Sequence, residues 1–240
     1  YALRTLFNTA IIGTSAILWL FLSGLVAGPF LWLFPGKSGK NVRKFVFIQS
    51  KGILFCMRLC SSGWKEERAP RPQGPCIVAA NHASALDLYT VAALGFTNVV
   101  YITKGWVFKL PFFRPVMQAA GYMDAEKTSP EEMLARCKTA VKNGCDIVLF
   151  PQGSRKNPQA RFKSGAFYLA ELLKLPVVPV AIGGTGKMLP AGTIKLHPAK
   201  IVLKSLPALM PGAFTGPLAH LEMAQTVKKQ IMQELEKENI

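Results

Sequence analysis

The sequence predicts an α/β fold, a mixed β-sheet flanked by helices, preceded by an N-terminal membrane-associated segment of two helices. Two observations support this expectation. From Cys76 onward, short apolar runs alternate with helix-like stretches, as in α/β sheets. Between Thr5 and Gly36, by contrast, there is no charged side chain. We therefore expect membrane-anchoring helices in residues 1–62 and an α/β domain in residues 63–240.

Composition narrows the class of partner. The 240 residues are 50% hydrophobic, with a mean hydropathy of +0.25, and carry 29 Lys and Arg against 13 Asp and Glu, a net charge of +16. Such an excess indicates an anionic partner, either nucleic acid or an anionic membrane surface with a phosphorylated substrate. The apolar composition favours the membrane, so we expect no nucleic-acid partner. Five cysteines without a Cys-x-x-Cys pair, and three histidines, give no metal-ligand spacing.

The N-terminal elements come first. Ala10–Phe34 is almost wholly apolar, and a bilayer core of about 30 Å needs roughly 20 such residues. Gly24, Gly28-Pro29 and Pro35 interrupt its second half, which predicts a shorter straight helix that enters the membrane and stops. The alternative is that this helix crosses the whole membrane.

The stretch from Lys37 to Ser62 predicts a second helix with two faces. Cations recur every seven residues on one face, and apolar residues occupy the other: Lys44, Lys51 and Arg58, against Val42, Phe45, Val46, Ile53, Cys56 and Met57. This pattern is typical of a helix lying in the membrane interface. The alternative is an ordinary surface helix packed on the domain. Gly63–Pro75, rich in Pro and charge, is expected to be a linker.

In the remaining chain the expected strands are Cys76–Ala80, Asn98–Thr103, Asp146–Phe150, Pro176–Ile182 and Lys200–Ser205. The expected helices are Ala85–Leu94, Pro130–Lys142, Lys163–Leu173 and His220–Lys237.

A candidate catalytic pair follows the first of these strands. Ser84 matches a helix N-cap, with Asp87 at the third helical position, which leaves His82 on the strand-to-helix loop. Inside one helix the two side chains would point roughly 140° apart, but from a loop the imidazole can fold back onto the carboxylate. That contact would fix the tautomer and leave the other ring nitrogen as a base. The alternative is a loop histidine beside a carboxylate that only caps the helix.

Two further segments carry polar groups after strands, and a third segment is apolar. Lys104 follows the second strand, and Lys127 closes the segment that ends in Gly121–Lys127. Phe150-Pro151-Gln152-Gly153-Ser154-Arg155 follows the third strand, where Gly153 permits close backbone approach, Ser154 supplies a hydroxyl and Arg155 offers a planar fork for phosphate oxygens. Val177–Ile182 is a short apolar run that a core strand would also explain.

In this order the segments beginning at Asn81, Lys104, Phe150 and Val177 resemble the four motifs of the glycerolipid acyltransferases, most closely the bacterial-type 1-acylglycerol-3-phosphate acyltransferases. Phe162–Ala166 also matches a segment typical of that family. Two residues depart from the family pattern: Gln152 stands where Glu is usual, and Lys127 where Arg is usual. The first brings no charge and the second cannot form a bidentate fork.

The resemblance implies transfer of a fatty acyl group from acyl-CoA or acyl carrier protein to the hydroxyl of lysophosphatidic acid, at the cytoplasmic face of a membrane, without a cofactor. It implies His82 as base and Asp87 as its support, with Lys104, Lys127 and Arg155 on the substrate phosphate. Positioning of the substrate would fall to Asn81, Gln152, Gly153 and Ser154. Alternatives are another acceptor, such as glycerol 3-phosphate, and a noncatalytic protein that binds anionic lipid.

Overall fold

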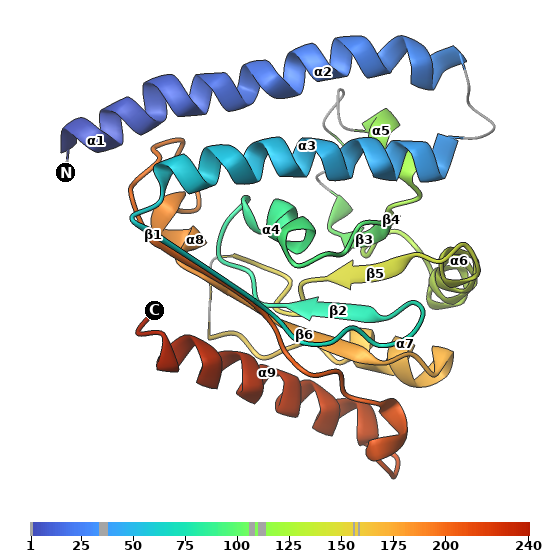
Figure 1. Cartoon of the computed structure of the whole chain (residues 1–240). Coiled ribbons are helices and arrows are strands. Elements are labelled where there is room, and N and C mark those ends of the chain that lie inside the picture. The colour runs from blue at the N-terminus through green and yellow to red at the C-terminus, as the bar shows by residue number, and fades with distance from the viewer. Residues whose placement is uncertain (1, 34–37, 106–108, 110–113, 156, 158) are drawn as a thin grey trace.

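The computed structural model describes residues 2–33, 38–105, 109, 114–155, 157 and 159–240 (Figure 1). The chain begins with one continuous helical segment made of α1 (Ala2–Phe7), a π-helical turn η1 (Asn8–Gly13) and α2 (Thr14–Leu33). The expected break at Gly24 and Gly28-Pro29 is wrong, because α2 runs through these residues to Leu33. Glycine and proline weaken a helix without forbidding it, and α2 packs along α3 (Ser38–Cys60).

Two contacts fix this helical segment to the rest of the chain. Gly52 of α3 leaves room for the indole of Trp19, since a Cβ at Gly52 would lie 2.3 Å from the Trp19 Nε1. Near the other end, the Thr9 hydroxyl accepts a hydrogen bond of 2.9 Å from the Leu196 backbone N–H. Among the described residues, no helix is both long and apolar enough to cross a membrane.

The two faces of α3 differ from the interfacial-helix expectation. Val42, Ile53 and Met57 are buried in the core, where α3 packs on α4 and α5. The expected apolar face is therefore used inside the protein, as in the alternative of a surface helix packed on the domain. This face packs inside the protein because α4 and α5 offer it apolar side chains to pack against.

The opposite face of α3 is mixed. Lys44 and Lys51 are exposed there, beside the exposed apolar side chains of Ile48, Phe55 and Leu59. Arg58 is not a free cation, because it pairs with Glu66 at 2.9 Å and lies 5.0 Å from the ring of Trp64.

The expected linker after α3 is wrong in its first half. Gly63–Arg68 forms strand β1, which pairs in parallel with β7 (Lys200–Ser205) in the register Gly63↔Lys200. Four of its six residues are charged, which suits the edge strand of a sheet because charged side chains discourage pairing with other chains.

In the described part of the chain one seven-stranded sheet has the order β1-β7-β6-β2-β5-β3-β4. The remaining strands are β2 (Ile77–Ala80), β3 (Val99–Thr103), β4 (Met123–Asp124), β5 (Asp146–Leu149) and β6 (Val177–Gly183). From β6 to β4 all neighbours are parallel, and β7 is antiparallel to β6. The sheet is therefore mixed, as predicted.

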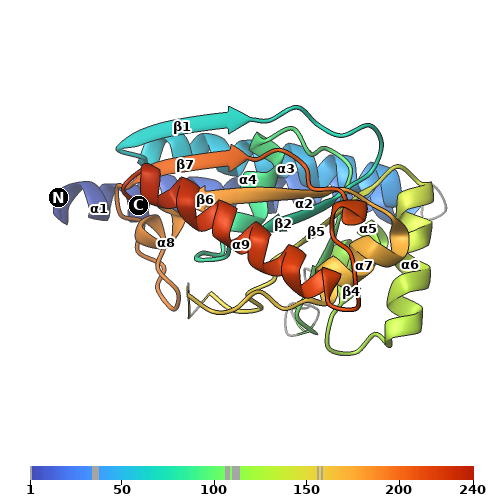
Figure 2. The ribbon, with the colours of Figure 1, turned by 90° about the horizontal axis from the view of Figure 1, so that it is seen from below.

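Helices cover both faces of the sheet. The helices after α3 are α4 (Asp87–Ala93), α5 (Arg114–Ala120), α6 (Pro130–Lys142), α7 (Gly165–Leu173), α8 (Thr185–Met188) and α9 (Ala219–Lys237), with a 3-10 turn η4 at Pro211–Ala213. Figures 1 and 2 show α3 and α4 on one face, and α7 and α9 on the other. The fold therefore has three layers, helix, sheet and helix.

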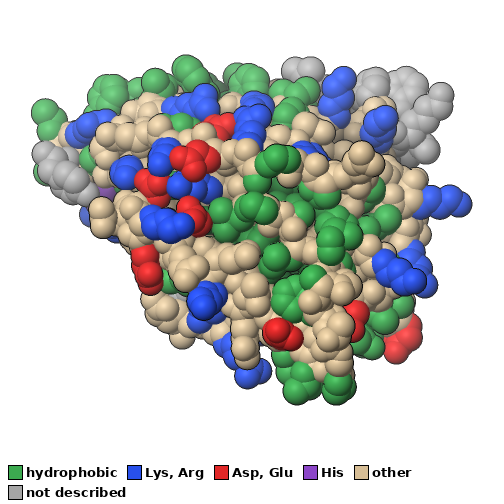
Figure 3. All heavy atoms as spheres, turned by 60° about the horizontal axis from the view of Figure 1, so that its bottom comes forward, with side chains coloured by type: hydrophobic (Ala, Val, Ile, Leu, Met, Phe, Trp, Pro, Cys, Tyr) green, Lys and Arg blue, Asp and Glu red, His purple; other side chains and the backbone are tan. Residues whose placement is uncertain are grey.

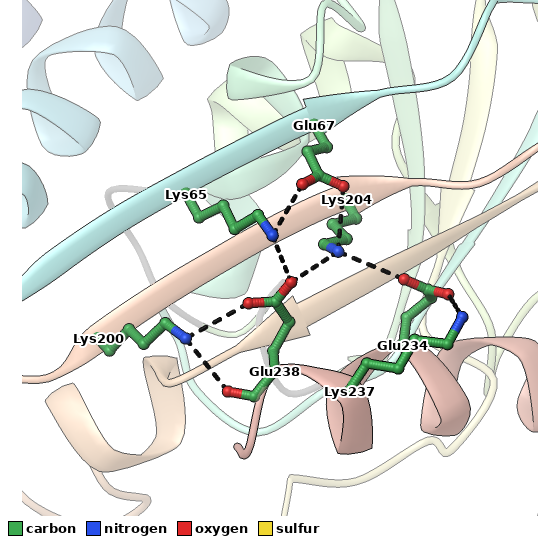
Figure 4. A network of polar contacts seen from close by, with 7 residues as sticks. All are labelled: Lys65, Glu67, Lys200, Lys204, Glu234, Lys237 and Glu238. Atoms are coloured by element: carbon green, nitrogen blue, oxygen red, sulfur yellow. Dashed lines mark hydrogen bonds and ion pairs between the residues drawn. The ribbon is translucent and has the colours of Figure 1, made fainter.

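An ion-pair network holds the C-terminal end of α9 against the sheet (Figure 4). Lys204 of β7, whose side chain is 7% exposed, contacts three carboxylates: Glu67 at 3.0 Å, Glu234 at 3.3 Å and Glu238 at 2.8 Å. Hydrogen bonds from Lys204 and Lys65 lower the pKa of Glu238 to about 2. The network thus links β1, β7 and α9 through one largely buried ammonium group.

Lys204→Met tests this link. It leaves three carboxylates without their shared cation, so we expect the thermal midpoint at neutral pH to fall by at least about 4 °C. Because the folded-state pKa of Glu238 is depressed, its contribution is present above about pH 4.5 and is lost as the pH falls toward about 2, and the difference between the proteins should shrink in the same window. Lys237→Met is the control, since Lys237 is 68% exposed and contacts Glu234 only. Equal losses in the two variants would contradict a special role for Lys204.

Candidate active site

The carboxyl ends of the parallel strands lie along one edge of the sheet. The chain leaves β2 toward α4 on one face and leaves the neighbouring strand β5 toward α7 on the other face (Figure 1). Neighbouring strands whose connections diverge in this way leave a crevice between their carboxyl ends, where ligands bind in α/β sheets. The loop after β2 carries His82 and the loop after β5 carries Gln152–Arg155.

His82 and Asp87 meet in this crevice, as the sequence predicted. The distance from His82 Nδ1 to Asp87 Oδ2 is 2.8 Å. The imidazole is 17% exposed and the carboxylate is fully buried. The ring of His82 also stacks on Phe150, with 4.2 Å between ring centroids. With Nδ1 engaged by the carboxylate, Nε2 is the ring nitrogen that remains for proton transfer.

The carboxylate of Asp87 also fastens the loop. Its Oδ2 accepts hydrogen bonds from the backbone N–H groups of Ala83 at 2.7 Å and of Ser84 at 2.8 Å. The expected N-cap at Ser84 is wrong, because α4 begins at Asp87 and its N-cap residue is Leu86. The Ser84 hydroxyl instead donates to the Leu189 carbonyl at 2.9 Å, just after α8. Competition from these contacts explains why the helix starts later than expected.

Two polar residues beside His82 bind backbone. Asn81 donates from Nδ2 to the Ile182 carbonyl at 2.8 Å and accepts from the Ile182 N–H at 2.7 Å. It is 7% exposed, and its amide joins the end of β2 to β6, while its expected part in positioning the substrate stays a prediction. The Oε1 of Gln152 accepts from the His82 N–H. A Glu would make the same bond, so the amide keeps this contact without the charge.

The loop after β5 brings cations to the crevice. Gly153 has a φ of +66°, and a Cβ there would lie 3.2 Å from the Cε of Lys163. The lysine side chain therefore lies directly over this turn, a neighbour that the sequence did not reveal. Ser154 and Arg155 follow and are half-buried. Among the described residues, no carboxylate lies within 4.0 Å of Arg155 or Lys163.

The remaining predicted cations lie along the same edge but farther from His82. Lys104 follows β3 and Lys127 follows β4, and both are exposed. With strands about 4.8 Å apart, β3 is roughly 10 Å and β4 roughly 14 Å from β2. The structure therefore brings together His82, Asp87 and Gln152, and places Lys104 and Lys127 at the rim.

The cysteines do not supply the nucleophile. All five are free, and burial raises the pKa of Cys60 and of Cys137 to about 11. A thiol is a poor nucleophile when it stays protonated at neutral pH. Within the described ranges there is no group of three or more His, Cys, Asp or Glu side chains that could hold a metal ion.

Comparison with known proteins agrees with this geometry. The profile of the acyltransferase family matches residues 64–183, from β1 to the end of β6, which includes His82, Asp87 and the loop after β5. The chain belongs to the acyltransferase family. This acyltransferase resembles enzymes named 1-acyl-sn-glycerol-3-phosphate acyltransferase. A chloroplast relative from Brassica napus is 35% identical over 53% of this chain and 38% of its own length. Another from Arabidopsis thaliana is 30% identical over 80% of this chain and 54% of its own length.

These plant relatives are matched over about half of their length or less. A bacterial relative from Helicobacter pylori with the same name is 23% identical over 66% of this chain and 69% of its own. The crystal structure of the 1-acyl-sn-glycerophosphate acyltransferase from Thermotoga maritima has a TM-score of 0.72, with 21% identity over 99% of this chain and 97% of that one. At this identity the likeness shows a shared fold.

The geometry predicts different stability effects for the two residues of the pair. Asp87→Ala removes the acceptor of two backbone N–H groups, so we expect a loss of about 2–4 kcal/mol in the free energy of unfolding. His82→Ala removes a partly exposed ring and one stacking contact, so a loss of about 1 kcal/mol is expected. Urea denaturation of the two variants measures the difference. Equal losses would show that the carboxylate does not fasten the loop.

Proposed function

We propose that this acyltransferase moves a fatty acyl group from a thioester to the free hydroxyl of lysophosphatidic acid and so forms phosphatidic acid. The observation that carries the proposal is the 2.8 Å contact between His82 Nδ1 and Asp87 Oδ2 in a crevice that also faces cations. Family membership and the shared name of the relatives support the same reaction. No cofactor is needed beyond the thioester, which is acyl-CoA or acyl carrier protein.

The chemistry of the pair follows from its geometry. Nε2 of His82 removes the proton of the acceptor hydroxyl while the oxygen attacks the thioester carbonyl. The tetrahedral intermediate then collapses, the carbon–sulfur bond breaks, and the imidazolium returns its proton to the departing thiolate. Asp87 stabilises the positive ring between these steps and holds its orientation. Both substrates are held together, so no acyl-enzyme is required.

The cations at the crevice are assigned to the acceptor phosphate. Arg155 lies in the loop after β5, beside Gln152, and its guanidinium is a planar fork that suits two phosphate oxygens. Lys104 and Lys127 act as point charges at the rim. Because Lys127 stands where Arg is usual in the family and cannot form a bidentate contact, the geometric selectivity for phosphate is reduced at this position. Gln152, Gly153 and Ser154 shape the turn that faces the acceptor.

Membrane attachment is assigned to the N-terminal helices. They expose large apolar side chains that the core does not use: Leu3, Leu6, Phe7, Ile11, Ile17, Leu18, Phe21, Leu22 and Leu25. Ile48, Phe55 and Leu59 of α3 add to this surface, with Lys44 and Lys51 beside them. Such a surface is suited to lie in the anionic cytoplasmic leaflet, where the lipid acceptor also resides.

The pair is tested by acyl transfer to lysophosphatidic acid. We expect His82→Ala to abolish transfer while binding of the acceptor is retained. Asp87→Asn should lower kcat by about 10³-fold or more, because an amide can still accept from the loop N–H groups but cannot stabilise an imidazolium. Since the residues act as a unit, the double variant should be little worse than His82→Ala.

Two results would oppose the proposal. Independent, multiplicative losses in the double variant would rule out a working pair. Efficient transfer to glycerol 3-phosphate, with none to lysophosphatidic acid, would keep the chemistry and reassign the acceptor.

Membrane attachment is tested on the exposed surface, since deleting α3 would open the core. We expect Ile17→Ser, Phe21→Ser and Leu25→Ser together to release the protein from vesicles. Lys44→Glu with Lys51→Glu should weaken binding to anionic vesicles selectively, because each cation near such a surface contributes about 1 kcal/mol. Leu172→Ser on α7, which is 45% exposed, is the control and should bind normally in a flotation assay. Normal binding of the triple variant would remove the assignment.

A further inference from the structure

A patch of apolar side chains bordered by cations covers the sheet face opposite α3. Figure 3 views this side and shows apolar side chains gathered over its middle and lower part, with Lys and Arg around them and a few Asp and Glu side chains at the lower edge. We call it the α9 patch and define it by Arg161, Tyr168, Leu218, Leu221, Lys228 and Lys229. Tyr168 is 50% and Leu218 62% exposed. A shallow pocket within it is lined by Arg161, Leu221 and Lys228 over the buried Phe162.

The α9 patch is continuous with the catalytic crevice. Gln159, in the segment that follows the site residues Gln152–Arg155, contacts α9, where the Lys228 ammonium donates to the Gln159 carbonyl at 2.8 Å. The base of the loop is closed by a hydrogen bond of 2.9 Å from the Lys163 N–H to the Pro151 carbonyl. One loop therefore contacts both the site and the patch.

The charge of this region selects an anionic occupant. Residues 147–229 contain eleven Lys and Arg but two acidic residues: Glu171, which lies 3.6 Å from His220, and Glu222, which is exposed on α9. Among the described residues, no carboxylate lies within 4.0 Å of Arg161, Lys228 or Lys229. Unpaired cations at the rim of an apolar surface attract partners of opposite charge and speed their encounter.

The shape of the patch favours a protein over a small ligand. Small-molecule sites enclose their ligand and orient it with buried polar groups. Here the polar side chains that line the pocket, Arg161, Gln225 and Lys228, are exposed or half-buried. A protruding Tyr and Leu inside a polar rim is instead the anatomy of a protein interface, where Tyr and Arg are enriched.

We propose that the α9 patch docks an acidic carrier protein that bears the acyl thioester on a phosphopantetheine arm. This rests on the proposed function, which requires a thioester donor. If the membrane lies against α2 and α3 as proposed, the lipid acceptor would enter from that side, and the water-soluble donor would be left the opposite face of the sheet, which α9 covers (Figure 1). The arm would extend from the pocket over Phe162 toward Arg155 and deliver the thioester to His82.

The experiment compares two donors with the 240-residue chain in mixed micelles with lysophosphatidic acid. One donor is palmitoyl-loaded acyl carrier protein and the other is palmitoyl-CoA. For Arg161→Glu with Lys229→Glu, and separately for Leu218→Glu, we expect the KM for the carrier protein to rise about tenfold with kcat retained. Both constants for palmitoyl-CoA should stay within roughly twofold of the unchanged protein. Raising the salt concentration should increase the carrier KM of the unchanged protein selectively.

Lys138→Glu with Lys142→Glu, on the exposed side of α6, is the control with the same change of charge and should leave both donors unaffected. An unchanged carrier KM in the patch variants, an equal loss with both donors, or wild-type activity with palmitoyl-CoA alone would overturn the docking proposal and leave the proposed function standing. No transfer by the unchanged protein from either donor would instead refute the proposed function. A variant that fails to fold loses activity with palmitoyl-CoA as well as with the carrier protein, so it is recognised as an equal loss with both donors.

Discussion

One carboxylate oxygen, Oδ2 of Asp87, accepts three hydrogen bonds and thereby determines the local structure of the site. It accepts from the Ala83 and Ser84 N–H groups and contacts Nδ1 of His82, all within 2.7–2.8 Å. The loop cannot rotate His82 away without breaking bonds to a buried charge, which is costly. The other oxygen, Oδ1, is buried without a hydrogen-bond partner. The carboxylate is thus oriented toward the loop and the imidazole together.

The sheet places the loop that carries His82 next to the loop after β5, which carries Gln152–Arg155. Because β2 and β5 are neighbours whose connecting helices go to opposite faces, the two loops at their ends open a crevice. The Asn81 amide ties the end of β2 to β6, and Gln152 ties the end of β5 to the His82 backbone. Three adjacent strands are therefore joined at the site by side chains, beyond the ladder of the sheet itself.

Local patterns in the sequence were sufficient where an element depends on its own residues. Helix α6 has the predicted bounds Pro130–Lys142 because Ser129 caps it, accepting from the Glu132 N–H, and Pro130 suits its first turn. The contact of His82 with Asp87 was one of two arrangements that the spacing allowed, and the resemblance to the acyltransferases favoured it. Strand β1 was missed because its residues are mostly charged and its partner, β7, lies far along the chain. Such pairing is a tertiary effect that local composition does not encode.

The candidate site shows the same difference between contacts that local sequence predicts and contacts that depend on the tertiary fold. Residue types and order predicted the contact between His82 and Asp87, while the contacts of Asn81 and Lys163 depend on β6 and on the turn at Gly153, which only the folded chain brings near. The apolar face of α3, which was expected to lie in the membrane interface, packs in the core for a related reason. An amphipathic helix pattern gives the apolar side but not what covers it, and here the core does.

The notch at Gly52 joins the N-terminal helices to the catalytic domain as one rigid piece. A Cβ at this position would lie 2.3 Å from the Trp19 indole, so any larger residue would push α2 off α3. Under the proposed membrane attachment, the depth at which α2 inserts would set the height of His82 above the bilayer, because α3 is itself part of the core. A lipid whose head group lies at a different depth would then present its hydroxyl above or below the imidazole. Acceptor choice would in this way depend on the distance of the reacting hydroxyl from the membrane plane as well as on its chemistry.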